Sequence, residues 1–177
     1  MTNFSNKVKK QITVRGKVAK LLVLRNTEFP GYYVTKCGKI YSVKNKGRPT
    51  FNYANPKRLK TMTRGMLGYE GLGISRNKNI ILKKQNGWEN PNIKIVGLFV
   101  HVAVMHTWRP LEKYTYKLGI SSKTFNKLPN IVKTLIRNSV TINHIDHDKF
   151  NNHVNNLEYC TDAQNAVAAK EFYKKKI

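Results

Sequence analysis

Residues 141–173 read TINHIDHDKFNNHVNNLEYCTDAQNAVAAKEFY, and they predict two short strands followed by a helix. Thr141–His144 and Leu157–Cys160 have the strand-like composition. The loop between them is rich in Asn, which tolerates left-handed backbone and bonds neighbouring amides. Thr161 and Gln164 have the spacing of a capping box, so a helix should begin directly after Thr161. The stretch is therefore expected to fold as a β-β-α unit.

The end of the first expected strand carries side chains suited to phosphodiester hydrolysis. That reaction needs an activated water, a cation on the phosphate and stabilisation of the leaving oxygen. An unperturbed imidazole titrates near pH 6.5, so His144 can take a proton close to neutral pH. General-base help of this kind is worth about 10²–10⁴ in rate.

The stretch resembles the HNH endonuclease motif, whose sequences often read NHIDGDK…NN…NLE…T…N. Asn143-His144, Asn156 and Asn165 fall at the landmarks of that motif. Asn156 follows His144 by 12 residues and Asn165 follows it by 21, as in the phage and intron homing group.

The resemblance extends upstream. EFPGYYVTKCGKIYSV (28–43), GYEGLGI (68–74) and FVHVAVMHTW (99–108) are similar to the β-rich module that often precedes HNH domains. The similar region spans residues 28–172, with an apparent insertion within 109–140.

The resemblance implies a role for each landmark residue. His144 is expected to be the general base, and Asn156 to brace the loop and orient His144. Asn143 and Asn165 are expected to hold one divalent ion, Mg²⁺ with Mn²⁺ as a substitute, through side-chain carbonyl oxygens. So sparse a protein shell suits Mg²⁺, which keeps waters and takes ligands from phosphate. The products would carry 5′-phosphate and 3′-hydroxyl ends.

Three positions depart from the family pattern. Asn143 stands where homing relatives often have Asp, which should weaken metal binding. His147 occupies a turn position where the family favours Gly, and Val102 replaces the Arg that usually follows the family's His, here His101. The remaining polar residues of the loop are interpreted as plain loop or turn residues: Asp146, Asp148, Asn151, Asn152, His153 and Asn155. His101 and His106 are not interpreted as metal ligands.

Charge points to a polyanionic partner. The formal net charge is +24, and all of it lies in residues 1–142, because residues 143–177 hold five bases and five acids. An excess of this size mixed with aromatic residues is typical of nucleic-acid binding. The expected contacts to double-stranded DNA are the bases of the β-rich part: Lys36, Lys39, Lys44, Lys46, Arg48, Lys57, Arg58, Lys60, Arg64, Arg76 and Lys78.

The chain is expected to be an α+β protein in four parts. These are a basic N-terminal arm (1–27), a β-rich DNA-binding region (28–108), a helical connector (109–140) and a ββα-metal, or His-Me finger, unit (141–173). The expected strands are Leu21–Leu24, Tyr32–Thr35, Lys39–Val43, Leu59–Met62, Leu67–Ile74, Asn79–Lys83 and Ile93–Phe99. The expected helices are Val100–Trp108 and Leu128–Asn138.

Three features of this plan leave alternatives open. The N-terminal arm could lie on phosphates or act as an organellar transit peptide. KLGISSKTFNKL (117–128) faintly resembles a helix-turn-helix. Gly68, Gly71 and Gly73 either weaken their strand or mark the close approach of another backbone, from nucleic acid or from ordinary sheet packing.

Composition also bounds the partners and the compartment. No apolar run is long enough for a membrane helix, so no membrane partner is expected. Cys37 and Cys160 imply no disulfide framework, which fits a reducing cytoplasm, bacterial or phage-infected. The leading hypothesis is a homing-type HNH endonuclease that hydrolyses duplex DNA, as a homodimer if both strands are cut. The alternative is a non-catalytic DNA- or RNA-binding protein, such as an inactive HNH relative or a ribosome-associated protein.

Overall fold

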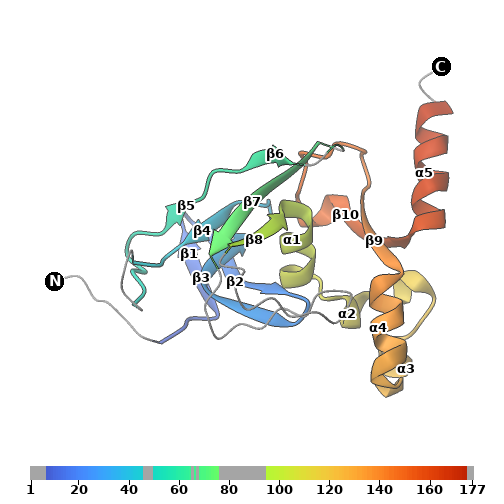
Figure 1. The fold of residues 1–177 in the computed structure, drawn as a ribbon, viewed down its shortest axis with the longest axis horizontal. Coiled ribbons are helices and arrows are strands. Elements are labelled where there is room, and N and C mark those ends of the chain that lie inside the picture. The colour runs from blue at the N-terminus through green and yellow to red at the C-terminus, as the bar shows by residue number, and fades with distance from the viewer. Residues whose placement is uncertain (1–6, 46–49, 65, 67, 76–94, 175–177) are drawn as a thin grey trace.

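A computed structural model describes residues 7–45, 50–64, 66, 68–75 and 95–174 of the chain. It has a β-rich N-terminal part, and most of its helices lie toward the C-terminus (Figure 1). The expected α+β class is confirmed at this level.

An antiparallel five-stranded sheet opens the chain, with its strands in sequence order. They are β1 (Gln11–Val14), β2 (Lys17–Leu24), β3 (Thr27–Thr35), β4 (Ile40–Ser42) and β5 (Lys57–Arg58). The strand expected at Leu21–Leu24 lies within β2, and β1 and the first half of β2 also belong to the sheet, although an arm was expected there. Alternate side chains there, such as Ile12 and Val14, are buried. On β2, Lys17 is exposed and Lys20 is partly exposed.

The turn between β3 and β4 is the hairpin that the sequence predicts. Gly38 takes the left-handed conformation, with φ of +77°. Val34 pairs with Ile40 across the hairpin.

A second antiparallel sheet has the order β6 (Met62–Arg64), β7 (Tyr69–Ser75) and β8 (Ile95–Phe99). The strand predicted over Leu59–Met62 is largely absent, because Leu59 instead donates its backbone N–H to Ile40 and packs against the core. The strand predicted over Asn79–Lys83 lies outside the described residues.

The helical segments follow the second sheet. They are α1 (Val100–Trp108), α2 (Leu111–Tyr114), a 3₁₀ turn (Thr115–Leu118), α3 (Ser122–Lys127) and α4 (Asn130–Asn138). Helix α1 begins and ends as predicted, and Pro129 stands directly before α4. The helix-turn-helix reading is not supported, because the six-residue α3 is preceded by a 3₁₀ turn rather than by a helix of comparable length.

The C-terminal stretch forms the predicted β-β-α unit. Strands β9 (Val140–His144) and β10 (Leu157–Thr161) pair antiparallel, and α5 (Asp162–Lys174) follows. The capping box is present, because Gln164 N–H donates to Thr161 Oγ1 over 3.2 Å and Thr161 N–H donates to Gln164 Oε1 over 2.8 Å.

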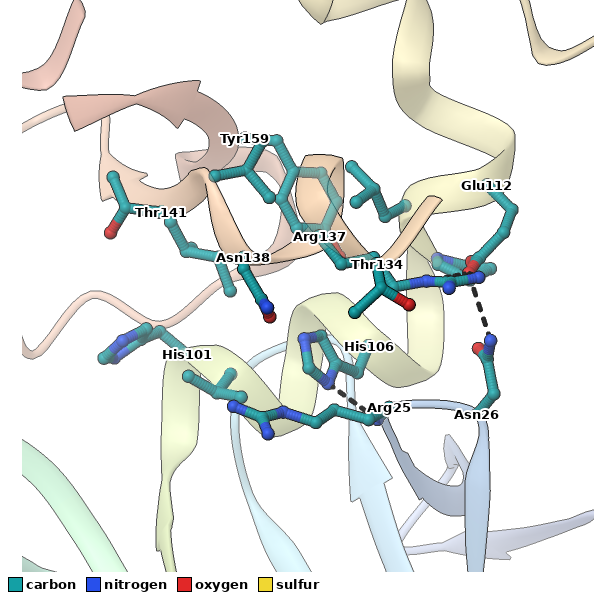
Figure 2. Close-up of a pocket in the computed structure, with 15 residues that line it drawn as sticks. Arg25, Asn26, His101, His106, Glu112, Thr134, Arg137, Asn138, Thr141 and Tyr159 are labelled. Carbon is teal, nitrogen blue, oxygen red and sulfur yellow. Dashed lines mark hydrogen bonds and ion pairs between the residues drawn. The ribbon is translucent and has the colours of Figure 1, made fainter. Parts of the chain in front are cut away.

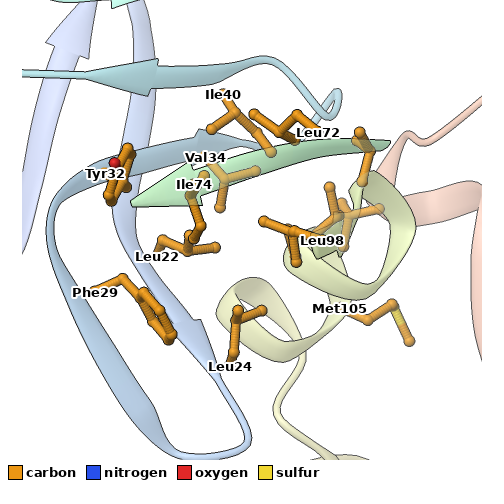
Figure 3. Close-up of a cluster of buried hydrophobic side chains, with 14 of the residues drawn as sticks. Leu22, Leu24, Phe29, Tyr32, Val34, Ile40, Leu72, Ile74, Leu98 and Met105 are labelled. Carbon is orange, nitrogen blue, oxygen red and sulfur yellow. The ribbon is translucent and has the colours of Figure 1, made fainter. Parts of the chain in front are cut away.

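One hydrophobic core joins the N-terminal sheets to the C-terminal unit. Its centre is formed by side chains such as Leu22, Phe29 and Met105 (Figure 3). Leu157 and Tyr159 of β10 belong to the same cluster. The β-β-α unit is therefore packed into the rest of the chain. In the described part of the chain, no helix has the length and apolarity to span a membrane.

Candidate functional site

His144 ends β9 and is buried, with 4% of its surface exposed. Its ring lies against two other rings from distant parts of the chain. Tyr69 of β7 stacks on it at 5.9 Å between centroids, and His101 of α1 meets it edge-on at 5.2 Å. The candidate base is thus held at the junction of the second sheet, α1 and the β-β-α unit.

A hydrogen-bond chain fixes the orientation of His144. Its Nε2 lies 3.1 Å from Oδ1 of Asn152, and Asn152 Nδ2 donates to Oε2 of Glu70 over 2.7 Å. Glu70 also accepts from the hydroxyl of Thr61. The interpretation of Asn152 as a plain loop residue is therefore wrong, because the residue is 3% exposed and bonded at both ends of its amide.

The hydrogen bonds of Asn152 determine which nitrogen of His144 carries the proton. Asn152 must turn Nδ2 toward Glu70, since a carboxylate oxygen accepts and cannot satisfy an amide oxygen. Its Oδ1 then faces His144, so Nε2 is the protonated nitrogen. The lone pair is left on Nδ1, which makes no hydrogen bond to any residue described in the structure. His144 can accept a proton at that atom.

His101 stays neutral beside His144. Burial, and to a smaller extent the neighbouring His144, lower the pKa of His101 to about 4. A neutral neighbour does not repel a proton arriving on His144 as a second imidazolium would. The Nδ1 atom of His101 is buried, and no described residue forms a hydrogen bond with it.

Asn156 braces the loop, as the resemblance implies, but it does not bond to His144. Its Nδ2 donates to Asp146 Oδ1 over 2.7 Å and to the carbonyl oxygen of Asn151 over 2.8 Å. Its Oδ1 accepts from the backbone N–H of Asp146 over 3.1 Å. Burial raises the pKa of Asp146, but the hydrogen bonds from Asn151 and Asn156 outweigh that effect and lower it. The expected orienting role belongs to Asn152 instead.

The two asparagines expected to hold metal lie on adjoining elements of the β-β-α unit. Asn143 precedes His144 on β9, and its Nδ2 donates to Glu158 over 3.3 Å. Its Oδ1 makes no hydrogen bond to a described residue, so this atom can act as a ligand. Asn165 lies one turn into α5, which contacts both β9 and β10. Neutral amide oxygens fit a hard cation such as Mg²⁺. In the described residues, no three or more His, Cys, Asp or Glu side chains form a metal-sized group.

His147 occupies the turn position at which the HNH motif, which this stretch resembles, favours Gly. Its φ is +61°, a conformation that glycine adopts without strain. The histidine is held there by stacking on Phe172 of α5, with 4.1 Å between ring centroids.

Seven of the bases expected to contact DNA lie in the described residues: Lys36, Lys39, Lys44, Lys57, Arg58, Lys60 and Arg64. Lys36 is exposed, and its ammonium lies 5.5 Å from the ring of Trp108. Lys44 lies over Tyr32 at 4.3 Å, while Lys57 and Arg58 occupy the exposed edge strand β5. Lys46, Arg48, Arg76 and Lys78 lie outside the described residues.

A cavity of about 530 Å³ lies beside β9, and Asn152 is not among the residues that line it (Figure 2). It is lined by α1, α4, β9 and the β2–β3 turn, and His101 borders it while His144 does not. Burial lowers the pKa of His106 in this cavity to about 4, and its Nδ1 accepts from the backbone N–H of Arg25 over 3.1 Å. We therefore place the candidate chemistry at His144 rather than in this cavity.

Sequence reasoning missed Glu70, Tyr69 and Asn152. The first two lie in the GYEGLGI segment, whose resemblance to the upstream module was noted without assigning either side chain a role. Asn152 is one of five asparagines in the loop and its flank, and only the fold separates it from the others.

Comparison of the chain with protein-family models, curated proteins and solved structures finds no match.

Proposed function

We propose that the protein is a DNA endonuclease of the HNH homing type, which hydrolyses phosphodiester bonds of duplex DNA. The observation that carries the proposal is the orientation of His144. Asn152 and Glu70 leave the lone pair on Nδ1, while Asn143, Asn156 and Asn165 occupy the other landmarks of the motif. The excess of positive charge in residues 1–142 supports a polyanionic substrate.

The proposed mechanism uses His144 as the general base. Its Nδ1 takes the proton of the attacking water, and the imidazolium that forms keeps its Nε2–H bonded to Asn152. Glu70 stabilises that cation through the Asn152 amide. Stacking on Tyr69 and contact with His101 hold the ring plane.

Asn143 and Asn165 would hold one divalent cation, which we propose to be Mg²⁺, through their amide oxygens. A bound cation of this kind would supply charge stabilisation on the phosphate and the leaving oxygen. Glu158 contributes by holding the amide of Asn143 in one orientation.

The proposal is tested with a mixed-sequence duplex library and sequencing of newly formed 5′ ends. We expect cuts at defined sites with Mg²⁺, and none with EDTA or with His144→Ala. His153→Asn is the matched control, because His153 lies in the same loop and Asn can still accept from the Asn155 N–H that His153 caps. Equal DNA binding by wild type and His144→Ala with no cutting by either would favour the non-catalytic alternative.

A further inference from the structure

Three glycines lie on the outer face of the β6–β7–β8 sheet, and we call the surface they form the glycine floor. Gly71 and Gly73 of β7 and Gly97 of β8 project to this face, and Gly73 pairs directly with Gly97. Gly71 is buried, and a Cβ there would lie 2.8 Å from the carbonyl oxygen of Leu98, so ordinary sheet packing accounts for it. Gly97 is exposed, and Arg64 is the one described residue within 4 Å of where its Cβ would lie, so sheet packing does not account for Gly97. Strand glycines without such packing mark the close approach of another group.

Arg64 lies across this floor. A Cβ on Gly97 would lie 3.3 Å from Arg64 Nη1. One on Gly73 would lie 2.9 Å from Ile95 Cγ2 and 3.6 Å from Arg64 Nη2. A Cβ on Gly71 would lie 2.9 Å from Arg64 Cδ. The glycines therefore allow the Arg64 side chain to lie flat against the backbone.

Among the described residues, no acidic side chain pairs with the guanidinium of Arg64. Its Nε is buried, and no described residue forms a hydrogen bond with it. A partly buried cation without a counter-charge is costly, and a planar fork of donors matches a phosphate.

This face is continuous with the candidate site. Arg64 pairs with Tyr69 in the sheet register, and Tyr69 stacks on His144. The rim carries the exposed apolar side chains of Met62 and Ile95, at 60% and 66% exposure. The outward-facing residues of these three strands include no acid.

We propose that one strand of duplex DNA lies on this glycine floor, with Arg64 binding a phosphate near the one that is cleaved. This inference rests on the proposed function, because the DNA must reach His144. A second copy of the chain is a poorer occupant, since two molecules of formal charge +24 repel each other.

The test uses Arg64→Met and Gly97→Thr, with Thr13→Val on the exposed side of β1 as the control. Binding of a fluorescein-labelled mixed-sequence duplex is measured by anisotropy in EDTA, over a range of salt concentrations. Arg64→Met should reduce the slope of log affinity against log salt by about one, as expected for the loss of one phosphate contact. Gly97→Thr should weaken binding at least about tenfold, equivalent to about 1.4 kcal/mol. It should leave the melting temperature equal or higher, because β-branched residues favour strands.

Wild-type affinity and slope in both variants would overturn the proposal. If Arg64→Met fails to fold, Gly97→Thr alone decides. A wild-type dimer that Gly97→Thr dissociates would assign the face to a second copy instead. Normal cutting by both variants would overturn the interface and keep the endonuclease, whereas Arg64-dependent binding by a protein that never cuts would do the reverse.

Discussion

Replacing Asn152 with Leu should damage both stability and the candidate chemistry. Leucine is close in size to asparagine but offers no donor or acceptor. The change removes the 2.7 Å bond to Glu70 and the 3.1 Å contact with His144. Of the two lost partners, His144 is buried and Glu70 is partly buried, so water replaces these hydrogen bonds incompletely.

The expected cost follows from these two bonds. A hydrogen bond to a charged group contributes about 1.5–3 kcal/mol, and a neutral one about 0.5–1.5 kcal/mol. The free energy of unfolding should therefore fall by about 2–4 kcal/mol. Without Asn152 the proton of His144 is no longer held on Nε2, so kcat should fall by a large part of the roughly 10²–10⁴ that a general base supplies. The KM for DNA should change little.

Three measurements check this reasoning. Urea unfolding gives the change in stability, and single-turnover cleavage separates kcat from KM. Long-range ¹H–¹⁵N spectra of the imidazole report the tautomer of His144 directly, in wild type and variant. Asn155→Leu is the matched control. Asn155 is an exposed loop residue whose Oδ1 accepts from Arg109, so the same substitution there should cost no more than about 1 kcal/mol.

A wild-type spectrum with the proton on Nδ1 would refute the assigned orientation without any variant. Stability and kcat equal to wild type in Asn152→Leu would show that the hydrogen-bond chain does not hold His144.

Four further outcomes follow from the structure. DNA affinity should fall by roughly 10³–10⁵ between about 50 and 200 mM salt if 6–10 phosphates are bound, and a flat response in a filter-binding titration would contradict this. In the folded protein the pKa values of His101 and His106 are about 4, against an ordinary 6.5, so the unfolded state binds more protons between these two values. The free energy of urea unfolding should therefore decrease as the pH is lowered from about 7 to 5, by up to about 1.4 kcal/mol per pH unit for each histidine. Replacing both histidines should remove this pH dependence. Gly38→Ala should destabilise the protein by about 2 kcal/mol or more in thermal unfolding, because φ is +77° and the new Cβ would lie 2.9 Å from Asn152 Cβ. The control is Gly119→Ala, where φ is +75° but the Cβ would meet no described atom within 4 Å; it should cost only about 1–2 kcal/mol. Iodoacetamide should modify the partly exposed Cys37 before the buried Cys160, whose pKa burial raises to about 11, and mass spectrometry of the peptides would reveal the opposite order.

The parts of the fold that were predicted correctly depend on local signals. The capping box at Thr161, the glycine turn at Gly38 and the apolar run of α1 each determine backbone conformation within a few residues. The strands before Leu21 were not predicted, because basic and apolar residues also mix in solvated segments, and only the pairing of β1 with β2 and of β2 with β3 distinguishes the two.

The same limit applies to the site. Asn143, His144, Asn156 and Asn165 were assigned by their spacing within one short unit. Glu70 could not be assigned, because its partner Asn152 lies 82 positions away and the two meet only when the second sheet packs on the loop. Long-range polar contacts of this kind leave no periodic signature in a sequence.

The attachment of the loop to the N-terminal sheets has a consequence for engineering and for synthesis. Val154 donates its backbone N–H to Lys36, and Asn152 bonds to Glu70. Moving residues 141–174 to another scaffold would carry the spaced asparagines and leave the support of His144 behind. The unit on its own is therefore not expected to cleave DNA. A ribosome synthesises the two N-terminal sheets first, so a nascent chain would complete the part proposed to bind DNA before the unit that carries His144.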